Sequence, residues 1–393
     1  MIHRGLWLHN LVQSYRVGSS SSSSTLFKLV YRYNSSTSLA KSSLKQSCEL
    51  SCKSNTEPSN MDWDKLGFKL MPTDYVYSMK CSNEGNFEQG RLELHGNIEL
   101  SPAAAVLNYG QGIFEGTKAY RKEDGSLLLF RPDQNGVRMR IGAERMCMPS
   151  PSVDQFVDAV KQTAIANRRW VPPSGKGSLY IRPLLMGTGA VLGVAPAPQY
   201  TFLAYASPVG NYFKEGLAPL RLYVEDEFDR ASPGGTGFVK TIGNYSRCLA
   251  ALSRAKNKGF SDVLFLDSVH KKYVEELSSC NIFIVQGNQI STPAANGTIL
   301  SGVTRSSIIE IARDHGFKVE ERKIAVDELM EAEEVFCTGT AVGVASVGSI
   351  TYHNKRVEFK TGSQSVSQKF YSTLIGIQTG VVEDKKGWIV EID

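Results

Sequence analysis

The chain has 393 residues, a formal net charge of +5 and a hydrophobic content of 41%. A chain of this length can bury more than one core, so we expect two or more domains. It contains no run of 18 or more apolar residues, which argues against a membrane-spanning helix. Residues 1–60 hold seven Lys or Arg and two Glu, and therefore carry the whole excess of +5. The remaining 333 residues are neutral, so we expect no nucleic-acid partner.

Residues 1–60 have the composition of a targeting segment. They contain sixteen serines, and their acidic residues occur only near the end. A positive, Ser-rich and acid-poor N-terminus is typical of an organellar transit peptide, and the alternative is a disordered low-complexity tail without an address. Basic residues interleaved with apolar ones favour a mitochondrial destination over a chloroplast. We therefore expect residues 1–60 to be a transit peptide and disordered tail.

The rest of the chain predicts a mixed α/β fold. Short apolar or alternating runs with turn-like flanks predict strands at 126–130, 178–185, 200–207, 220–225, 261–267 and 281–285. Helical periodicity predicts helices at 132–146, 153–169, 245–259 and 304–316, and the last two end at a glycine suited to a C-cap. The turn-rich segment 207–216 predicts a boundary between a small N-terminal domain, 61–206, and a large C-terminal domain, 217–393.

Several common catalytic motifs are missing from the sequence. The stretch "GTGAVLG" at 187–193 has the spacing GxGxxxG with no ribose-binding acid after it, so we expect a loop there. No P-loop, GxSxG elbow or HExxH helix occurs. The six histidines are scattered and the seven cysteines form no CxxC pair, so we expect no metal site and reduced thiols.

The stretch "GTGFVKTIGNY" at 235–245 isolates one lysine. Between Arg230 and Arg247, Lys240 is the only residue of sixteen that can carry a charge, and glycines and apolar residues surround it. Partial desolvation would lower the pKa of its ammonium group. A neutral amine is what a Schiff base with a carbonyl requires. From this stretch alone, the alternative is an exposed lysine on a flexible loop.

A second stretch, at 275–305, distinguishes these interpretations. Its spacing of Glu276, Asn281, Phe283, Thr292, Gly302 and Arg305 resembles the signature of the class IV aminotransferases, the pyridoxal-phosphate enzymes of fold type IV. The motifs at 108–121, 130–140, 177–183, 239–245, 299–305 and 338–341 are similar to those of the branched-chain amino acid aminotransferases and follow the same order. The resemblance extends from about residue 65 to the C-terminus. It implies an α/β fold of the α+β type, with two mixed domains, the cofactor between them, and a homodimer.

The resemblance also implies roles for residues at the cofactor, pyridoxal 5'-phosphate. Lys240 matches the catalytic lysine that forms a Schiff base with the cofactor aldehyde, and Glu276 the carboxylate that pairs with the ring nitrogen. Arg138 matches the arginine at the phosphate, whereas Arg140 and Arg145 are expected to be solvated. The other implied cofactor-binding residues are Tyr245, Ser279, Val303, Thr304 and Thr340.

The implied substrates are leucine, isoleucine and valine with their 2-oxo acids, and glutamate with 2-oxoglutarate. Tyr109, Phe114 and Tyr180 resemble aromatic residues that enclose a branched side chain. The N–H groups near Thr340 and Ala341 resemble those that hold the α-carboxylate, and Arg182 resembles an arginine close to the substrate.

Other functions remain open from the sequence. Within the same fold type, a D-amino acid aminotransferase and an aminodeoxychorismate lyase share Lys240 and Glu276 but lack "FEGTKAYR" followed by "GSLYIRP". A family branch that acts on chain-elongated methionine derivatives is not separated by these motifs. A non-catalytic descendant that binds a small acid would be favoured by loss of Lys240, Arg138 or Glu276, and all three are present.

Overall fold

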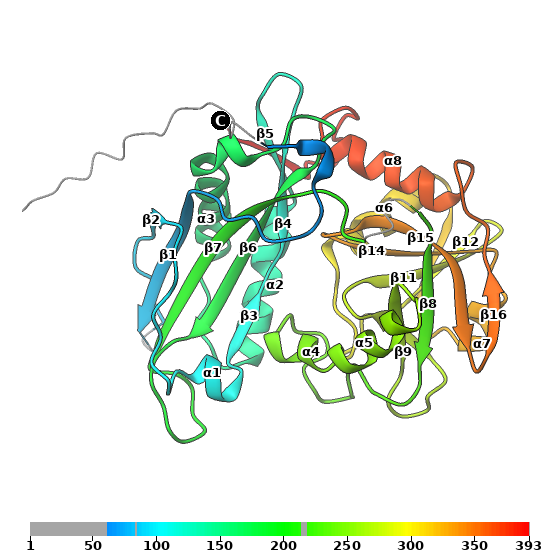
Figure 1. Ribbon diagram of the computed structural model, residues 1–393, viewed down its shortest axis with the longest axis horizontal. Coiled ribbons are helices and arrows are strands. Elements are labelled where there is room, and N and C mark those ends of the chain that lie inside the picture. The colour runs from blue at the N-terminus through cyan, green and yellow to red at the C-terminus, as the bar shows by residue number, and fades with distance from the viewer. Residues whose placement is uncertain (1–60, 83–84, 214–217, 393) are drawn as a thin grey trace, which may run out of the picture. The chain divides into compact units, whose positions relative to one another are not determined.

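The computed structural model describes residues 61–82, 85–213 and 218–392, and these residues belong to one compact unit. Two β-sheets, each covered by helices, make up this unit (Figure 1). The targeting segment expected at 1–60 lies outside the described residues. No helix in the described part of the chain is long and apolar enough to cross a membrane.

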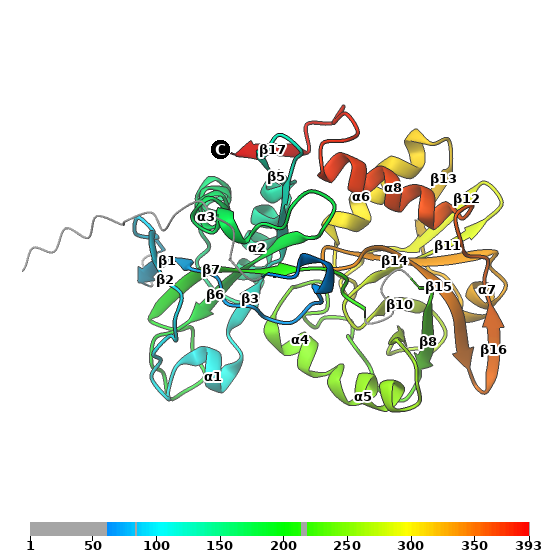
Figure 2. The same cartoon turned by 45° about the horizontal axis from the view of Figure 1, so that its top comes forward.

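The first sheet is antiparallel and has the strand order β17-β5-β4-β6-β7-β1-β2, with β3 paired to β6. Its longest strands, β6 and β7, pair over ten residues through the centre of the sheet. Its last strand comes from the end of the chain and lies beside β5 (Figure 2). The strands are β1 (Tyr75–Ser82), β2 (Arg91–Leu94), β3 (Gly112–Phe114), β4 (Thr117–Arg121), β5 (Leu127–Phe130), β6 (Ser178–Gly187), β7 (Gln199–Val209) and β17 (Ile389–Ile392).

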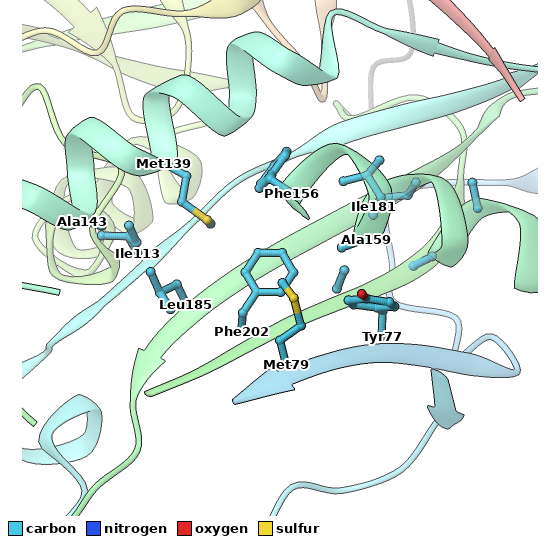
Figure 3. Packing of buried hydrophobic residues seen from close by; sticks show 14 of the residues in the cluster. Tyr77, Met79, Ile113, Met139, Ala143, Phe156, Ala159, Ile181, Leu185 and Phe202 are labelled. Atoms are coloured by element: carbon cyan, nitrogen blue, oxygen red, sulfur yellow. The ribbon is translucent and has the colours of Figure 1, made fainter. Parts of the chain in front are cut away.

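Two helices cover this sheet, α2 (Pro132–Arg145) and α3 (Val153–Ala166). Helix α3 begins with a capping box, in which the side chains of Ser152 and Gln155 each bond the other residue's backbone N–H. Its buried residues recur at helical spacing and form one apolar face. That face packs with residues of α2 and the sheet in a continuous core (Figure 3). The buried residues of α3 are Phe156, Ala159, Val160, Thr163 and Ala164.

The second sheet is mixed and has the order β10-β9-β8-β15-β14-β11-β12-β13, with β16 on β15. Strand β8 runs parallel to both of its neighbours, and β12 runs parallel to β13. The strands are β8 (Leu220–Glu225), β9 (Asp262–Leu266), β10 (Val274–Leu277), β11 (Asn281–Gln286), β12 (Gln289–Pro293), β13 (Lys318–Arg322), β14 (Glu334–Gly339), β15 (Gly343–Tyr352) and β16 (Lys355–Glu358).

Helices pack against this second sheet as well. Helix α5 (Leu249–Asn257) contacts β9, and α6 (Val303–Asp314) and α8 (Val366–Gln378) contact each other and β14. A core of aromatic and aliphatic side chains lies under α6 and α8. The remaining elements are α1 (Ala105–Tyr109), α4 (Ile242–Ser246), α7 (Val326–Met330), η1 (Trp63–Lys65) and η2 (Arg168–Trp170).

The mixed α/β prediction and all six predicted strands are confirmed. The helix predicted at 245–259 is wrong as one element, because the structure has α4 and α5 with a break at Arg247 and Cys248. The glycines expected to end two helices, Gly259 and Gly316, have left-handed φ values of 84° and 81°. Strand β7 reaches Val209, inside the segment taken as the domain boundary. The boundary itself stays a prediction.

Candidate active site

A cavity of about 300 Å³ gathers twelve of the thirteen side chains singled out in the sequence. Cavities of about 420 and 660 Å³ lie elsewhere in the described part of the chain and contain none of them. The chemistry of its walls therefore identifies this cavity as the candidate active site. The twelve residues are Phe114, Arg138, Tyr180, Arg182, Lys240, Tyr245, Glu276, Ser279, Val303, Thr304, Thr340 and Ala341.

The loop before α4 holds the backbone of Lys240 in place. The Phe114 N–H donates to the Lys240 carbonyl at 3.0 Å, and the Thr241 hydroxyl donates to the Gly112 carbonyl at 2.9 Å. The side-chain amide of Asn244, on α4, donates to the carbonyls of Thr236 and Val239 in this loop. These bonds satisfy backbone groups that a glycine-rich segment would otherwise leave unpaired.

The Lys240 amine lies inside the cavity, which excludes the exposed-loop interpretation. Its Nζ donates to the Tyr245 hydroxyl at 2.9 Å and lies 4.8 Å from the centre of the Phe114 ring. Burial, helped by the positive charge of Arg138, lowers the pKa of Lys240 to about 8. Burial also raises the pKa of the Tyr245 phenol. At neutral pH a useful fraction of the lysine is therefore a neutral amine beside a neutral phenol.

Glu276 lies at another wall of the cavity, on β10, and only 2% of its side chain is exposed. Its Oε1 pairs with Nη1 of the equally buried Arg230 at 2.8 Å and accepts the Leu300 N–H at 2.8 Å. Its Oε2 accepts the Asn281 side-chain amide at 3.2 Å. Burial raises the pKa of Glu276, and the charge of Arg230 opposes that shift. Because it is buried, Glu276 is not a solvated surface acid, and its hydrogen-bond and ion-pair partners favour the carboxylate form.

Arg138 projects from α2, and a buried carboxylate holds its guanidinium. Glu115 accepts Nε at 2.7 Å and Nη2 at 2.6 Å, in a bidentate pair, and the Ser301 carbonyl accepts Nη1 at 3.0 Å. A guanidinium has five N–H donors, so two remain for a ligand. On the same helix, Arg140 and Arg145 are exposed, as expected.

The N-terminal turn of α6 lines the cavity with Gly302, Val303 and Thr304. The first N–H groups of a helix have no partner within the helix, and its N-terminus favours negative charge. A side chain at position 302 would collide with the Asn281 amide oxygen, so glycine is required for this close packing. The helix terminus and Arg138 together form a setting suited to an anion.

Aromatic residues and Arg182 form the remaining walls. The Arg182 guanidinium lies 4.7 Å from the centre of the Phe114 ring, and its Nη2 donates to the Tyr180 hydroxyl at 3.4 Å. Phe68 and Tyr212 also line the cavity, and the Tyr212 hydroxyl lies 3.2 Å from the Ser279 hydroxyl. Sequence reasoning missed both residues, which lie outside the motifs that it used.

Tyr109 does not line this cavity. It ends α1, is 40% exposed, and donates its hydroxyl hydrogen to the Leu192 carbonyl. Its expected contact with substrate stays a prediction.

The groups in the cavity fit pyridoxal phosphate. The cavity brings together the Lys240 amine for the aldehyde, the Glu276 carboxylate for the ring nitrogen and the Tyr245 phenol. Arg138 and the N-terminus of α6 suit the phosphate. Among the described residues, no three His, Cys, Asp or Glu side chains lie close enough to hold a metal ion.

Comparison with known proteins gives similarities along most of the chain. Residues 112–350 match the family model described as amino-transferase class IV. The chain is 68% identical to branched-chain-amino-acid aminotransferase 2, chloroplastic, of Arabidopsis thaliana over 85% of this chain and 86% of that protein. It is 62% identical to the mitochondrial branched-chain-amino-acid aminotransferase 1 of that plant, over 86% and 88%. A methionine aminotransferase of the plant is 52% identical, over 86% and 96%.

Solved structures agree with these relationships and confirm the predicted fold type. The branched-chain amino acid aminotransferase of Escherichia coli matches with a TM-score of 0.70 and 27% identity, over 82% of this chain and 100% of that one. A T.th. branched-chain amino acid aminotransferase with pyridoxamine 5'-phosphate matches with a TM-score of 0.69 and 27% identity, over 82% and 99%. The family model covers more than half of the chain, and these plant relatives are 52–68% identical. The chain therefore belongs to the class IV aminotransferases and resembles their plant branched-chain members.

Proposed function

We propose that this protein transfers the amino group between leucine, isoleucine or valine and 2-oxoglutarate, with pyridoxal phosphate as its cofactor. The observation that carries the proposal is the meeting of Lys240, Glu276 and Arg138 in one cavity with aromatic walls. The high identity to plant branched-chain aminotransferases supports the substrate class.

Each of the three residues has a distinct task in this reaction. When bound, pyridoxal phosphate supplies an aldehyde and an electron-withdrawing ring. Lys240 binds that aldehyde and afterwards moves the substrate Cα proton on its Nζ. The Glu276 carboxylate holds a proton at the ring nitrogen, and Arg230 keeps that carboxylate ionised and oriented. Arg138 uses its free N–H groups to hold the phosphate, while Glu115 fixes its orientation.

Tyr245, Ser279, Val303, Thr304 and Thr340 complete the proposed cofactor site, since all of them line the cavity. For the substrate, Phe114 and Tyr180 enclose the branched side chain. The N–H groups near Thr340 and Ala341 receive the α-carboxylate, and Arg182 lies beside the aromatic walls to help receive glutamate.

We expect the purified protein to turn over all three branched-chain amino acids with 2-oxoglutarate. An apolar pocket distinguishes one methylene by only about 1–3 kcal/mol, so kcat/KM should differ among them by less than about 200-fold. Steady-state kinetics with the three amino acids, a chain-elongated methionine derivative and D-leucine provides the measurement. A methionine derivative or a D-amino acid that exceeds every branched-chain substrate tenfold would contradict the proposed specificity. Cofactor binding without any turnover would favour a non-catalytic descendant.

We also propose a homodimer, supported by an exposed apolar surface near Tyr109. Leu107, Leu192 and Val194 are 61%, 92% and 91% exposed, and Tyr109 bonds the backbone of Leu192. Exposed apolar side chains gathered in this way mark interaction surfaces. A mass in solution equal to that of a single 43.2 kDa chain would refute the dimer.

The proposed destination of the chain is an organelle, and we favour the mitochondrion on the composition of residues 1–60. The relatives include both chloroplastic and mitochondrial proteins. A chain that begins at Met61 should keep full turnover, because every cavity residue lies beyond it, and its isoelectric point should fall below 8.7. Residues 1–60 fused to a fluorescent protein should enter mitochondria. Fluorescence confined to plastids would correct the compartment, and lost activity on truncation would give the segment a structural role.

A further inference from the structure

The turn between β14 and β15 has an unusual arrangement of backbone groups. It comprises residues 340–342, between the paired glycines Gly339 and Gly343, and Gly343 has a left-handed φ of 70°. In the described part of the chain, no N–H group of this turn donates to a protein acceptor. Thr340 and Ala341 line the active-site cavity. The turn can therefore offer free N–H groups to an anion, as a concave run of backbone amides does.

A half-buried lysine contacts this turn. Lys118, on β4 of the first sheet, donates its Nζ hydrogen to the Ala341 carbonyl at 3.0 Å. Lys118 lines a separate cavity of about 370 Å³ and is not among the residues that line the active-site cavity, whereas Ala341 lines both. The lysine thus contacts the turn from the second cavity and does not line the active-site cavity.

The Ala341 carbonyl oxygen accepts the hydrogen bond of this ammonium group. Among the described residues, no carboxylate lies within ion-pair distance of Lys118, although Lys122, just beyond the same strand, pairs with Asp124 at 2.9 Å. Burial lowers the pKa of Lys118 to about 8, so the ammonium form still predominates at pH 7. A hydrogen bond from a charged donor is stronger than one between neutral groups.

The orientation of the Ala341 carbonyl matters for a carboxylate substrate. The Ala341 carbonyl and the Val342 N–H belong to one planar trans peptide group and point in opposite directions, so the orientation of this group decides which of them faces the cavity. A carbonyl oxygen facing the cavity would repel a carboxylate, whereas N–H groups attract it. We propose that Lys118 is a positioning residue that keeps the Ala341 carbonyl turned away from the substrate, so that the N–H groups of the turn face the α-carboxylate. This inference rests on the carboxylate-binding role proposed above for the turn.

The test compares two ligands that differ in charge and share one shape, 4-methylvaleric acid and its amide. Their binding to the holoenzyme is measured by calorimetry at pH 7, for the wild type and for Lys118→Met. The variant should bind the acid about 10- to 100-fold more weakly, because the turn would lose one charge-assisted hydrogen bond to the carboxylate. It should bind the amide as the wild type does. A role confined to packing would weaken both ligands alike.

Two further variants sharpen the result. Lys122→Met removes a partly exposed lysine just beyond the same strand and should leave both affinities unchanged. Lys118→Gln keeps a neutral hydrogen-bond donor, so its loss of affinity for the acid should be intermediate. This variant replaces Lys118→Met if the methionine variant does not fold. Equal weakening of acid and amide, or unchanged binding of the acid, would overturn the assignment of Lys118 even while branched-chain turnover persists. Absence of that turnover in the wild type would instead refute the proposed function.

Discussion

Replacing Lys240 with alanine is expected to abolish transamination, with a loss in kcat of at least about 1,000-fold. Proton transfer by a positioned base contributes roughly 10²–10⁴-fold in enzymes, and this lysine also binds the aldehyde. With a pKa of about 8, roughly one Lys240 amine in ten is neutral at pH 7. An ordinary lysine, with a pKa near 10.4, would supply fewer than about one in a thousand.

The measurement combines turnover with the visible spectrum. The wild-type holoenzyme should be yellow because the cofactor is covalently held, and the spectrum of Lys240→Ala should become that of the free aldehyde. Lys256→Ala, at an exposed position on α5, is the matched control and should change neither property. Wild-type turnover by the Lys240 variant would show that another amine is the nucleophile.

The sequence signature at 275–305 is recognisable because it combines residues of two kinds. Glu276 and Asn281 line the cavity. Three other signature residues support the fold: Phe283 stacks on Phe336, Thr292 bonds the Ile282 carbonyl, and Arg305 bonds the Pro293 carbonyl and Glu321. The spacing is therefore set partly by the geometry of β11, β12 and α6, which makes it detectable in a single sequence.

The partners of the site residues could not be predicted in the same way. Arg138 meets Glu115 across 23 residues, and Lys118 meets Ala341 across 223. No local periodicity reports such contacts, because the first depends on how α2 packs on the first sheet and the second on how the two sheets meet. Arg230 is a similar case: in the sequence it only marked the edge of an uncharged stretch, yet it is the buried partner of Glu276.

Some elements escaped prediction because contacts with other residues set their bounds. The periodicity over 245–259 continues through the break between α4 and α5. Within α4, Asn244 bonds backbone carbonyls upstream, and this helix ends at Ser246. Strand β17 has only four residues and is stabilised by its pairing with β5. In both cases contacts with residues outside the element outweigh its own propensity.

Variants at the two ends of the cofactor site should lose activity for different reasons. Arg138→Ala removes the clamp for the phosphate, so the dissociation constant of the cofactor should rise about 10- to 100-fold, and excess pyridoxal phosphate should restore part of the rate. Arg140→Ala, on the same helix and exposed, is the control and should bind cofactor as the wild type does. Spectroscopic titration of cofactor-free protein measures both dissociation constants.

Glu276→Gln should lower kcat with the cofactor still bound, because the ring nitrogen loses its anionic partner. It should also lower the free energy of unfolding by about 3–5 kcal/mol, since the guanidinium of Arg230 is left buried and unpaired. Burial raises the pKa of the neighbouring Glu275 to about 7, so about half of its side chains are already neutral at pH 7, and Glu275→Gln serves as the matched control. Added cofactor should rescue Arg138→Ala and leave Glu276→Gln impaired. Equal rescue of both variants would mean that Glu276 merely helps to hold the cofactor, because a residue that tunes the ring cannot be replaced by mass action.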